Sequence, residues 1–268
     1  MKIDKQVIPY LRANAKEALG VTDFTGAVIQ KLEGGDYNYN YHVQQARCDV
    51  VVRLNIEPQS GSDNQIVHEY KTLEFLASHD VAPKPLFVDN ARKHFPYGLL
   101  IEEYVPGGHV QFSVAAVRRV AEAMATLHTI PIAGAPLERR DNPLRDQFDS
   151  VVAYLREYEH RQNPNSDIIR LGQLIISQLK KKLPELEVLY SRRSVVHTDP
   201  NPAKTNDTSI EDRIPPRLKL YTLTAVIWGA SRIADVSEGK IDPHLGKQNY
   251  ERYQQLVDPS ALENALRM

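Results

Sequence analysis

The spacing of apolar residues divides the chain into an early region of strands and a later region of helices. Residues 4–19 carry apolar side chains at helical spacing, and Gly20 follows where a helix commonly ends. Residues 26–54 then alternate with the two-residue period of a strand, which predicts three strands in series with a turn near residues 34–36. One helix and two more strands are expected at residues 64–78, 86–88 and 97–105.

The pattern changes at the turn signal Pro106-Gly107-Gly108, which we take as the boundary between two lobes, residues 1–105 and 106–268. Beyond it, apolar residues recur at the spacing of amphipathic helices. Such helices are expected at residues 114–128, 147–158, 168–183, 250–256 and 259–267. A sheet lobe followed by a helical lobe is an α+β architecture.

Three features interrupt the helical pattern of the second lobe. Pro184 is expected to end the helix before it and to open a short helix toward Tyr190. The pair Val195-Val196 predicts a short buried strand, and residues 218–228 predict a β-rich segment. The second lobe is therefore expected to contain some strand as well as helix.

Composition limits the partners and the compartment. The chain has 268 residues, enough for one large domain or for two lobes that share a cleft. Its net charge of −1 provides no overall field to attract nucleic acid or an anionic membrane, so we expect neither partner. The single Cys48 forms no internal disulfide, and no Cys/His spacing resembles a zinc site. With no secretion signal and no run of 18 apolar residues, we expect a cytoplasmic protein.

The segment 195–206 holds the clearest candidate chemistry. Its two valines lead into a turn that contains His197, Asp199 and several amides. Kinases use an Asp in such a loop to orient the attacking hydroxyl, and an Asn about five residues later to hold a nucleotide-bound Mg²⁺. Here Lys204 is the fifth residue after Asp199, so the loop indicates phosphoryl transfer without the expected metal ligand. A turn stabilised by Asp and Asn is the alternative interpretation.

Other motifs precede this loop in order along the chain. A Gly34-Gly35-Asp36 turn joins two predicted strands, Arg53 ends a valine-rich strand, and Glu69 lies on the next predicted helix. An extended run over residues 99–107 and a Leu127-His128 pair at a helix end follow. Each motif alone is equally well an ordinary hairpin turn, strand end, helix surface or buried strand.

Taken in order, these motifs resemble the aminoglycoside phosphotransferase and choline kinase family, which shares the protein-kinase-like fold. The resemblance runs from about Gly34 to about Asp235. It implies an α+β two-lobe fold, with a small antiparallel-sheet N-lobe and a larger, mainly helical C-lobe. It also implies ATP or GTP with Mg²⁺ as cofactors, and a small-molecule acceptor as the partner.

The resemblance assigns residues to the nucleotide. Gly34 and Gly35 correspond to the hairpin over the phosphates, where glycine lets the backbone approach an anion. Arg53 corresponds to the phosphate-contacting cation, and Glu69 to its acidic partner. By position only, the adenine-binding backbone segment is Glu102, Glu103, Tyr104 and Val105.

The resemblance also assigns catalytic and metal-binding roles. Asp199 would orient the substrate hydroxyl and accept its proton late, and His197 would support the loop. His128 is expected to be structural. Because Lys204 replaces the amide ligand, Asn206 and Asn201 are the candidate Mg²⁺ ligands of a remodelled loop.

A second departure from the family lies further along the chain. The segment 225–228 corresponds to a strand that should end in a metal-binding Asp, so Ile227 stands in place of that carboxylate. Asp235 resembles the later Asp that supports the catalytic loop. Losing the metal carboxylate removes several kcal/mol of transition-state stabilisation. A weak kinase, a pseudokinase and a chain that has diverged as a block over about 203–227 all remain open.

The leading hypothesis is a kinase-like phosphotransferase that moves the γ-phosphoryl of ATP or GTP to a hydroxyl of an aminoglycoside- or amino-alcohol-like acceptor. The alternative is a pseudokinase that binds nucleotide or a partner without turnover, and a third interpretation is a plain α+β interaction domain. Acidic residues of the helical lobe would attract a cationic amine or form solvated helix faces. They are Asp146, Asp149, Glu157 and Glu159.

Overall fold

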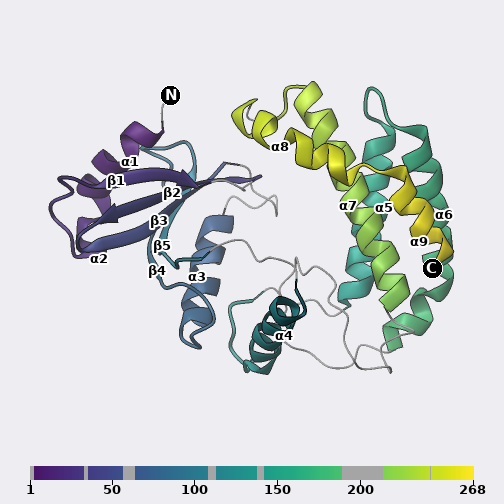
Figure 1. Ribbon diagram of the computed structural model, residues 1–268, viewed down its shortest axis with the longest axis horizontal. Coiled ribbons are helices and arrows are strands. Elements are labelled where there is room, and N and C mark those ends of the chain that lie inside the picture. The colour runs from purple at the N-terminus through teal and green to yellow at the C-terminus, as the bar shows by residue number, and fades with distance from the viewer. Residues whose placement is uncertain are drawn as a thin grey trace. The chain divides into compact units, whose positions relative to one another are not determined.

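The computed structural model shows a β-sheet with flanking helices and a separate group of helices (Figure 1). The residues that it describes are 3–32, 36–56, 64–107, 113–137, 142–188, 214–241 and 243–268. They fall into two compact units, one holding the described residues up to 137 and the other those from 142 onward. The combination confirms the α+β class. The division into lobes of residues 1–105 and 106–268 stays a prediction.

Five antiparallel strands form the sheet of the first unit, in the order β1-β2-β3-β5-β4. They are β1 (Val28–Leu32), β2 (Asn38–Gln45), β3 (Cys48–Asn55), β4 (Pro85–Asp89) and β5 (Gly98–Glu103). All five were predicted from the sequence, and the first three, which the alternating pattern predicted, form the expected meander.

The two faces of this sheet differ in polarity because side chains alternate along each strand. One face carries the buried residues Tyr39, Tyr41, Val43, Val50, Val52, Leu54, Leu99 and Ile101. On the other face, Asn40 of β2 lies opposite Arg53 of β3. Helix α3 (Gln65–Ala77), which the sequence predicted, contacts β4 and β5. The polar face therefore meets charged groups from a helix as well as from strands.

The N-terminal segment is helical, as its periodicity predicts. It consists of α1 (Asp4–Tyr10), a π-helical turn η1 (Leu11–Ala15) and α2 (Lys16–Leu19). Gly20 ends it with a φ of 63°, which glycine adopts without steric strain. The hydroxyl of Tyr10 donates to Asp89 Oδ2 at 2.6 Å and so links this segment to β4.

Helix α4 (Val114–Thr129) confirms the helix expected at residues 114–128. Its N-terminus is capped by Ser113, whose Oγ accepts a hydrogen bond from the backbone N–H of Ala116 at 3.1 Å.

Helices make up the described part of the second unit. They are α5 (Pro143–Glu159), α6 (Ser166–Val188), α7 (Ile214–Ser237), α8 (Pro243–Leu256) and α9 (Pro259–Arg267). The apolar faces of α5, α6, α7 and α9 share one core, and α8 contacts α7. A Cβ on Gly172 of α6 would lie 3.1 Å from Leu155 of α5 and 3.2 Å from Leu223 of α7, so these three helices pack closely there. None of the helices described along the chain combines the length and apolar character needed to cross a membrane.

The prediction that Pro184 ends a helix is wrong. Helix α6 continues through Pro184 to Val188. A proline inside a helix removes one backbone hydrogen bond and strains the preceding turn. Here Ile175, Leu179 and Leu183 lie on one buried side of α6, and their packing outweighs that cost.

The prediction of a β-rich segment over residues 218–228 is also wrong, because these residues lie inside α7. Threonine, valine and isoleucine are enriched there, and such residues favour strands. The same segment also places Leu220, Leu223, Ile227 and Ala230 at helical spacing, and all four are buried in the core of the unit. Burial of that helical stripe overrides the local β preference.

Candidate functional site

Arg53 lies between two carboxylates on the polar face of the first unit's sheet. Its Nη1 is 3.3 Å from Glu69 Oε2, and its Nη2 is 2.8 Å from Glu102 Oε1. We call these three residues the ion triad. The register explains the second contact, since Glu102 of β5 pairs with Val51 and so lies diagonal to Arg53 on the same face. The sequence predicted the pairing with Glu69, but for Glu102 it indicated only a backbone role.

Helix α3 fixes Glu69 through a second contact. Gln65, one turn earlier, donates its Nε2 to Glu69 Oε1 at 2.8 Å. One carboxylate oxygen of Glu69 therefore faces Gln65 and the other faces Arg53. The carboxylate is oriented toward the sheet before any ligand binds.

Burial differs across the triad. The side chains of Arg53 and Glu69 keep 30% and 24% of their area exposed, whereas Glu102 keeps 6%. Burial raises the pKa of Glu102, the nearby Arg53 lowers it, and Glu69 raises it, with an overall upward shift. Arg53 thus remains accessible to a ligand, whereas Glu102, one of its two counter-ions, is buried.

Polar atoms without partners gather around the same guanidinium. Among the described residues, Arg53 Nε, Glu102 Oε2 and Asn40 Oδ1 are buried and have no hydrogen-bond partner. Asn40 lies directly opposite Arg53 in the β2–β3 register. Buried polar groups in proteins are usually hydrogen-bonded, so these three atoms retain unused hydrogen-bonding capacity beside the guanidinium.

The other three residues of the predicted adenine-binding segment do not join the triad. Glu103 is exposed, and its Oε2 accepts a 3.4 Å hydrogen bond from the backbone N–H of Lys84. The ring of Tyr104 stacks on His42, with centroids 3.7 Å apart and an interplanar angle of 18°. Val105 is 60% exposed. A nucleotide role for this segment stays a prediction.

His42 ties Tyr104 to the β2–β3 hairpin, which the sequence did not indicate. His42 Nε2 lies 2.5 Å from Asp49 Oδ1, and the backbone N–H of Tyr104 donates to the Asp49 carbonyl at 3.2 Å. The end of β5 is therefore held by both a ring contact and a backbone hydrogen bond. No sequence pattern places His42 beside Tyr104, because the contact depends on strand order.

Several predicted site residues lie outside the described part of the chain, and their roles stay predictions. The two glycines of the predicted phosphate hairpin are Gly34 and Gly35. The predicted catalytic and metal-binding residues of the 195–206 segment are His197, Asp199, Asn201 and Asn206. Lys204 lies in the same undescribed segment.

Ile227 does not occupy the end of a strand. It lies within α7 with no exposed surface, in the core of the second unit. Trp228, the aromatic residue of the expected metal motif, instead packs edge-on against Tyr253 of α8 at 5.5 Å. The proposed correspondence of residues 225–228 with a metal-binding strand is therefore wrong. Within the described ranges, no three His, Cys, Asp or Glu side chains cluster as a metal site would require.

Residues 28–203 match the model of the phosphotransferase enzyme family, which is more than half of the chain. The chain belongs to this family. No curated protein sequence matches it.

Solved structures share the fold. A Ralstonia eutropha protein named as an aminoglycoside phosphotransferase has 13% identity and a TM-score of 0.62, covering 97% of this chain and 98% of that one. The aminoglycoside phosphotransferase APH(4)-Ia has 13% identity and a TM-score of 0.58, with 98% of both chains covered. Choline kinase of Cryptosporidium parvum has 13% identity and a TM-score of 0.52, covering 98% and 97%. The likeness confirms the protein-kinase-like fold class.

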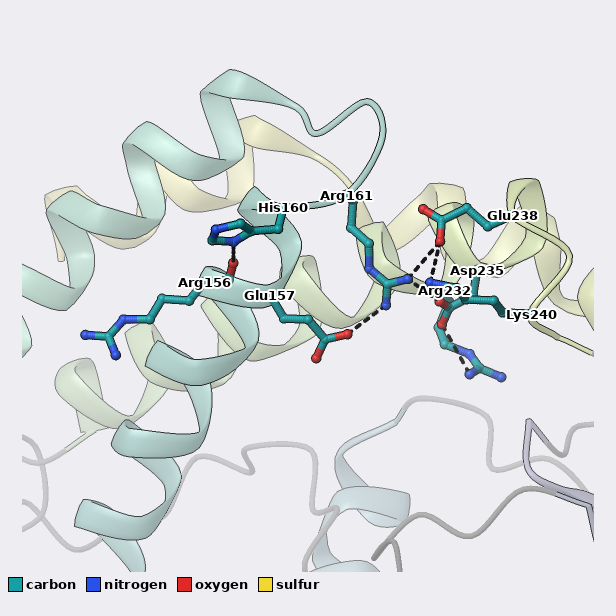
Figure 2. A network of polar contacts seen from close by, with 8 residues as sticks. All are labelled: Arg156, Glu157, His160, Arg161, Arg232, Asp235, Glu238 and Lys240. Carbon is teal, nitrogen blue, oxygen red and sulfur yellow. Dashed lines mark hydrogen bonds and ion pairs between the residues drawn. The ribbon is translucent and has the colours of Figure 1, made fainter.

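In this phosphotransferase-family chain, Asp235 belongs to a second cluster of charges (Figure 2). Arg161, which follows α5, lies 2.9 Å from Asp235 and 3.1 Å from Glu238, both near the end of α7, and 2.9 Å from Glu157. Arg232 lies 3.6 Å from Asp235, and Lys240 lies 2.6 Å from Glu238. We call these six residues the clamp, because they join the end of α5 to the end of α7.

The clamp shifts the pKa values of its members. Burial lowers the pKa of Arg161, but Asp235, Glu238 and Glu157 raise it more, so that the overall shift is upward. The hydrogen bond from Lys240 is the main cause that lowers the pKa of Glu238. Both shifts favour the charged forms. A role for Asp235 in supporting the catalytic loop stays a prediction.

Two of the four acidic residues proposed to attract a cationic acceptor have partners within the second unit. Glu157 pairs with Arg161, and Glu159 accepts a 2.8 Å hydrogen bond from Gln173 Nε2. These contacts favour a structural role for both, and they leave Asp146 and Asp149 of α5 as the candidates for acceptor binding.

Proposed function

We propose that this chain binds the phosphates of ATP or GTP at Arg53 and transfers the γ-phosphoryl group to a hydroxyl of a small polar acceptor. The observation that carries the proposal is the ion triad, in which a guanidinium is held in place and still keeps 30% of its area exposed. A guanidinium matches phosphate oxygens with a planar fork of N–H donors. Holding it in place lowers the ordering cost of binding.

Family membership and solved relatives support this proposal. APH(4)-Ia has been crystallised as a ternary complex with ADP and hygromycin B, and another with AMP-PNP and hygromycin B. We extend to this chain the nucleotide and the class of acceptor, an aminoglycoside- or amino-alcohol-like molecule. A cytoplasmic location is part of the same proposal.

The predicted roles of the chain's own residues then follow from chemistry. Arg53 would neutralise phosphate charge, and Glu69 and Gln65 would keep its fork aimed at the phosphates. Asp199 would orient the acceptor hydroxyl and take its proton late in the reaction, as an Asp does in kinase loops. His197 would support that loop.

Mg²⁺ does not fit the residues that the structure describes. Among the described residues no three His, Cys, Asp or Glu side chains cluster, and no Asp or Glu occurs between Asp212 and Asp235 in the sequence. Protonated Lys204 has donors only and cannot ligate a cation. Asn201 and Asn206 remain the predicted amide ligands.

That observation favours a second candidate function, a pseudokinase that binds nucleotide without turnover. Residues 225–228 lie inside helix α7 and so provide no metal-binding strand. Without a metal carboxylate, charge that develops on the transferred phosphoryl would be stabilised less. Arg53 and the triad are needed equally in both candidates, so binding alone does not separate them.

Binding is tested with ATP and GTP, each with and without Mg²⁺, by thermal shift and equilibrium titration. Arg53→Met is expected to weaken nucleotide affinity roughly 10- to 100-fold, because it removes charge-assisted hydrogen bonds. Arg47→Met is the matched control, since Arg47 is an exposed arginine of the β2–β3 turn. Equal affinity of Arg53→Met and wild type would remove the basis of the proposal.

Turnover is tested by ³¹P NMR with ATP and acceptors of the two classes. A new phosphoester signal in wild type that falls roughly 10²- to 10⁴-fold in Asp199→Asn supports the phosphotransferase. Metal-independent nucleotide binding with no phosphoester from either acceptor class supports the pseudokinase instead.

A further inference from the structure

The ion triad carries more negative than positive charge. Arg53 supplies one positive charge, and Glu69 and Glu102 supply two negative charges when both are ionised. An anion that approaches Arg53 therefore meets a cluster with a net charge of about −1. This is an unfavourable arrangement for a phosphate site unless one carboxylate can give way.

The two carboxylates hold Arg53 differently. Glu69 makes the longer contact, 3.3 Å, keeps 24% of its side chain exposed and is also held by Gln65. Glu102 makes the shorter contact, 2.8 Å, and keeps 6% exposed. Its second oxygen, Oε2, is buried with no hydrogen-bond partner among the described residues. Glu102 is therefore the tighter ligand of the guanidinium and the less satisfied carboxylate.

We propose that Glu102 competes internally with phosphate for the guanidinium of Arg53, and so sets the affinity of the chain for nucleotides. Ionised Glu102 occupies Nη2 of Arg53, and an incoming phosphate must displace it or bind beside it. Protonated Glu102 leaves a neutral triad, in which Arg53 can turn its fork to the ligand. This inference rests on the proposed function and identifies a residue that regulates it.

The charged groups around Glu102 support a dependence on pH. Arg53 faces it from β3 and Glu69 faces it from α3, while its register partners Val51 of β3 and Pro85 of β4 carry no charge. Burial raises the pKa of Glu102, and Arg53 only partly opposes this. Phosphate affinity is therefore expected to rise as pH falls through the titration of Glu102.

The test titrates the full-length chain with inorganic tripolyphosphate, and separately with ATP, in metal-free buffer between about pH 5 and pH 8. Glu102→Gln keeps the shape and one acceptor oxygen but removes the charge. It is expected to bind both probes about tenfold more tightly than wild type at the upper end of this range. A charge within about 4–6 Å shifts a neighbouring pKa by about one unit or more, which corresponds to a tenfold change in an equilibrium constant. The advantage should shrink as pH falls, because protonation removes the charge of the wild-type Glu102.

Glu74→Gln is the charge-matched control, because Glu74 is an exposed residue of the same helix as Glu69. Glu102→Asp, which keeps the charge, should keep the pH dependence, and it serves as the second variant if Glu102→Gln does not fold. Equal binding by Glu102→Gln and Glu74→Gln, or a Glu102→Asp profile without pH dependence, would overturn the inference alone. If Arg53→Met binds both probes as wild type does, the proposed function fails as well.

Discussion

The ion triad and the clamp both place an arginine among carboxylates, yet they differ in balance and exposure. In the clamp, Arg161, Arg232 and Lys240 face three carboxylates, so that the charges cancel, and the side chain of Arg161 is 12% exposed. In the triad, one arginine faces two carboxylates, and its side chain is 30% exposed. The charges of the clamp balance within the cluster, whereas the triad keeps an excess of negative charge beside an accessible arginine.

The comparison shows that an arginine–carboxylate contact does not by itself define a site. The clamp joins two segments of the second unit that are far apart in sequence, and its pKa shifts favour the charged forms already present. In the triad the shift favours the neutral form instead, because burial raises the pKa of Glu102. The excess of negative charge is therefore the feature by which we distinguish the triad, as a candidate binding site, from the clamp, as a structural contact.

The largest expected effect tests whether position 227 of α7 belongs to the apolar core of the second unit. Ile227→Asp introduces a carboxylate inside α7, at a position with no exposed surface. Burying an unpaired carboxylate should lower the free energy of unfolding by about 4 kcal/mol or more. Urea denaturation measures this, and Ile227→Val, expected to cost about 1 kcal/mol, is the control. A stable Ile227→Asp protein that gains Mg²⁺ affinity would contradict the helical assignment.

The next effect tests the clamp. Arg161→Met leaves Asp235 without its closest cation in a largely covered site, so we expect a loss of about 3 kcal/mol in the free energy of unfolding. Nucleotide affinity should not change. Arg170→Met is the control, because Arg170 is 59% exposed, pairs with Asp167 and should cost about 0.5 kcal/mol or less. Similar losses in both variants would show that the clamp is no more than a surface ion pair.

The sequence predicts a helix or strand correctly where the spacing of its apolar residues fits only one of the two. Strands β2 and β3 alternate between buried and more exposed residues, and all five strands of the first unit were found where they were expected. Residues 218–228 allow two interpretations, because β-branched side chains favour a strand while Leu220, Leu223 and Ile227 share one side of a helix. Only the surrounding core decides between them.

The candidate site shows the same limit. Arg53 and Glu69 follow from the order of motifs, but the side-chain contact of Glu102 depends on which residue of β5 lies opposite Val51. A one-residue change of register would move the Glu102 side chain to the other face of the sheet. Arg161 and Asp235 meet only because α5 and α7 pack together, and the local sequence around either residue does not predict the pair.

A smaller effect on stability is expected from Arg53→Met. This variant should lose mainly nucleotide affinity, whereas Arg161→Met should lose mainly stability. The free energy of unfolding should fall by only about 1 kcal/mol, because Glu69 is partly solvated and Glu102 can take up a proton. Nucleotide affinity should fall, as argued above. The test measures the free energy of unfolding and the nucleotide affinity of both Arg53→Met and Arg161→Met. If both variants lose stability equally and keep affinity, the triad is a second clamp.

The smallest effect is a pH dependence of opposite sign in the two clusters. The pKa of Glu102 is raised, chiefly by burial, so its stabilising contribution is complete below the ordinary Glu pKa and is lost as pH rises through the raised value. The pKa of Glu238 is lowered, chiefly by its hydrogen bond with Lys240, so its contribution is present above the ordinary pKa and is lost as pH falls. Urea unfolding of Glu102→Gln and Glu238→Gln between about pH 3 and pH 8 should therefore give differences from wild type that change in opposite directions. Differences that change in the same direction would mean that imbalance of charge does not distinguish the triad from the clamp.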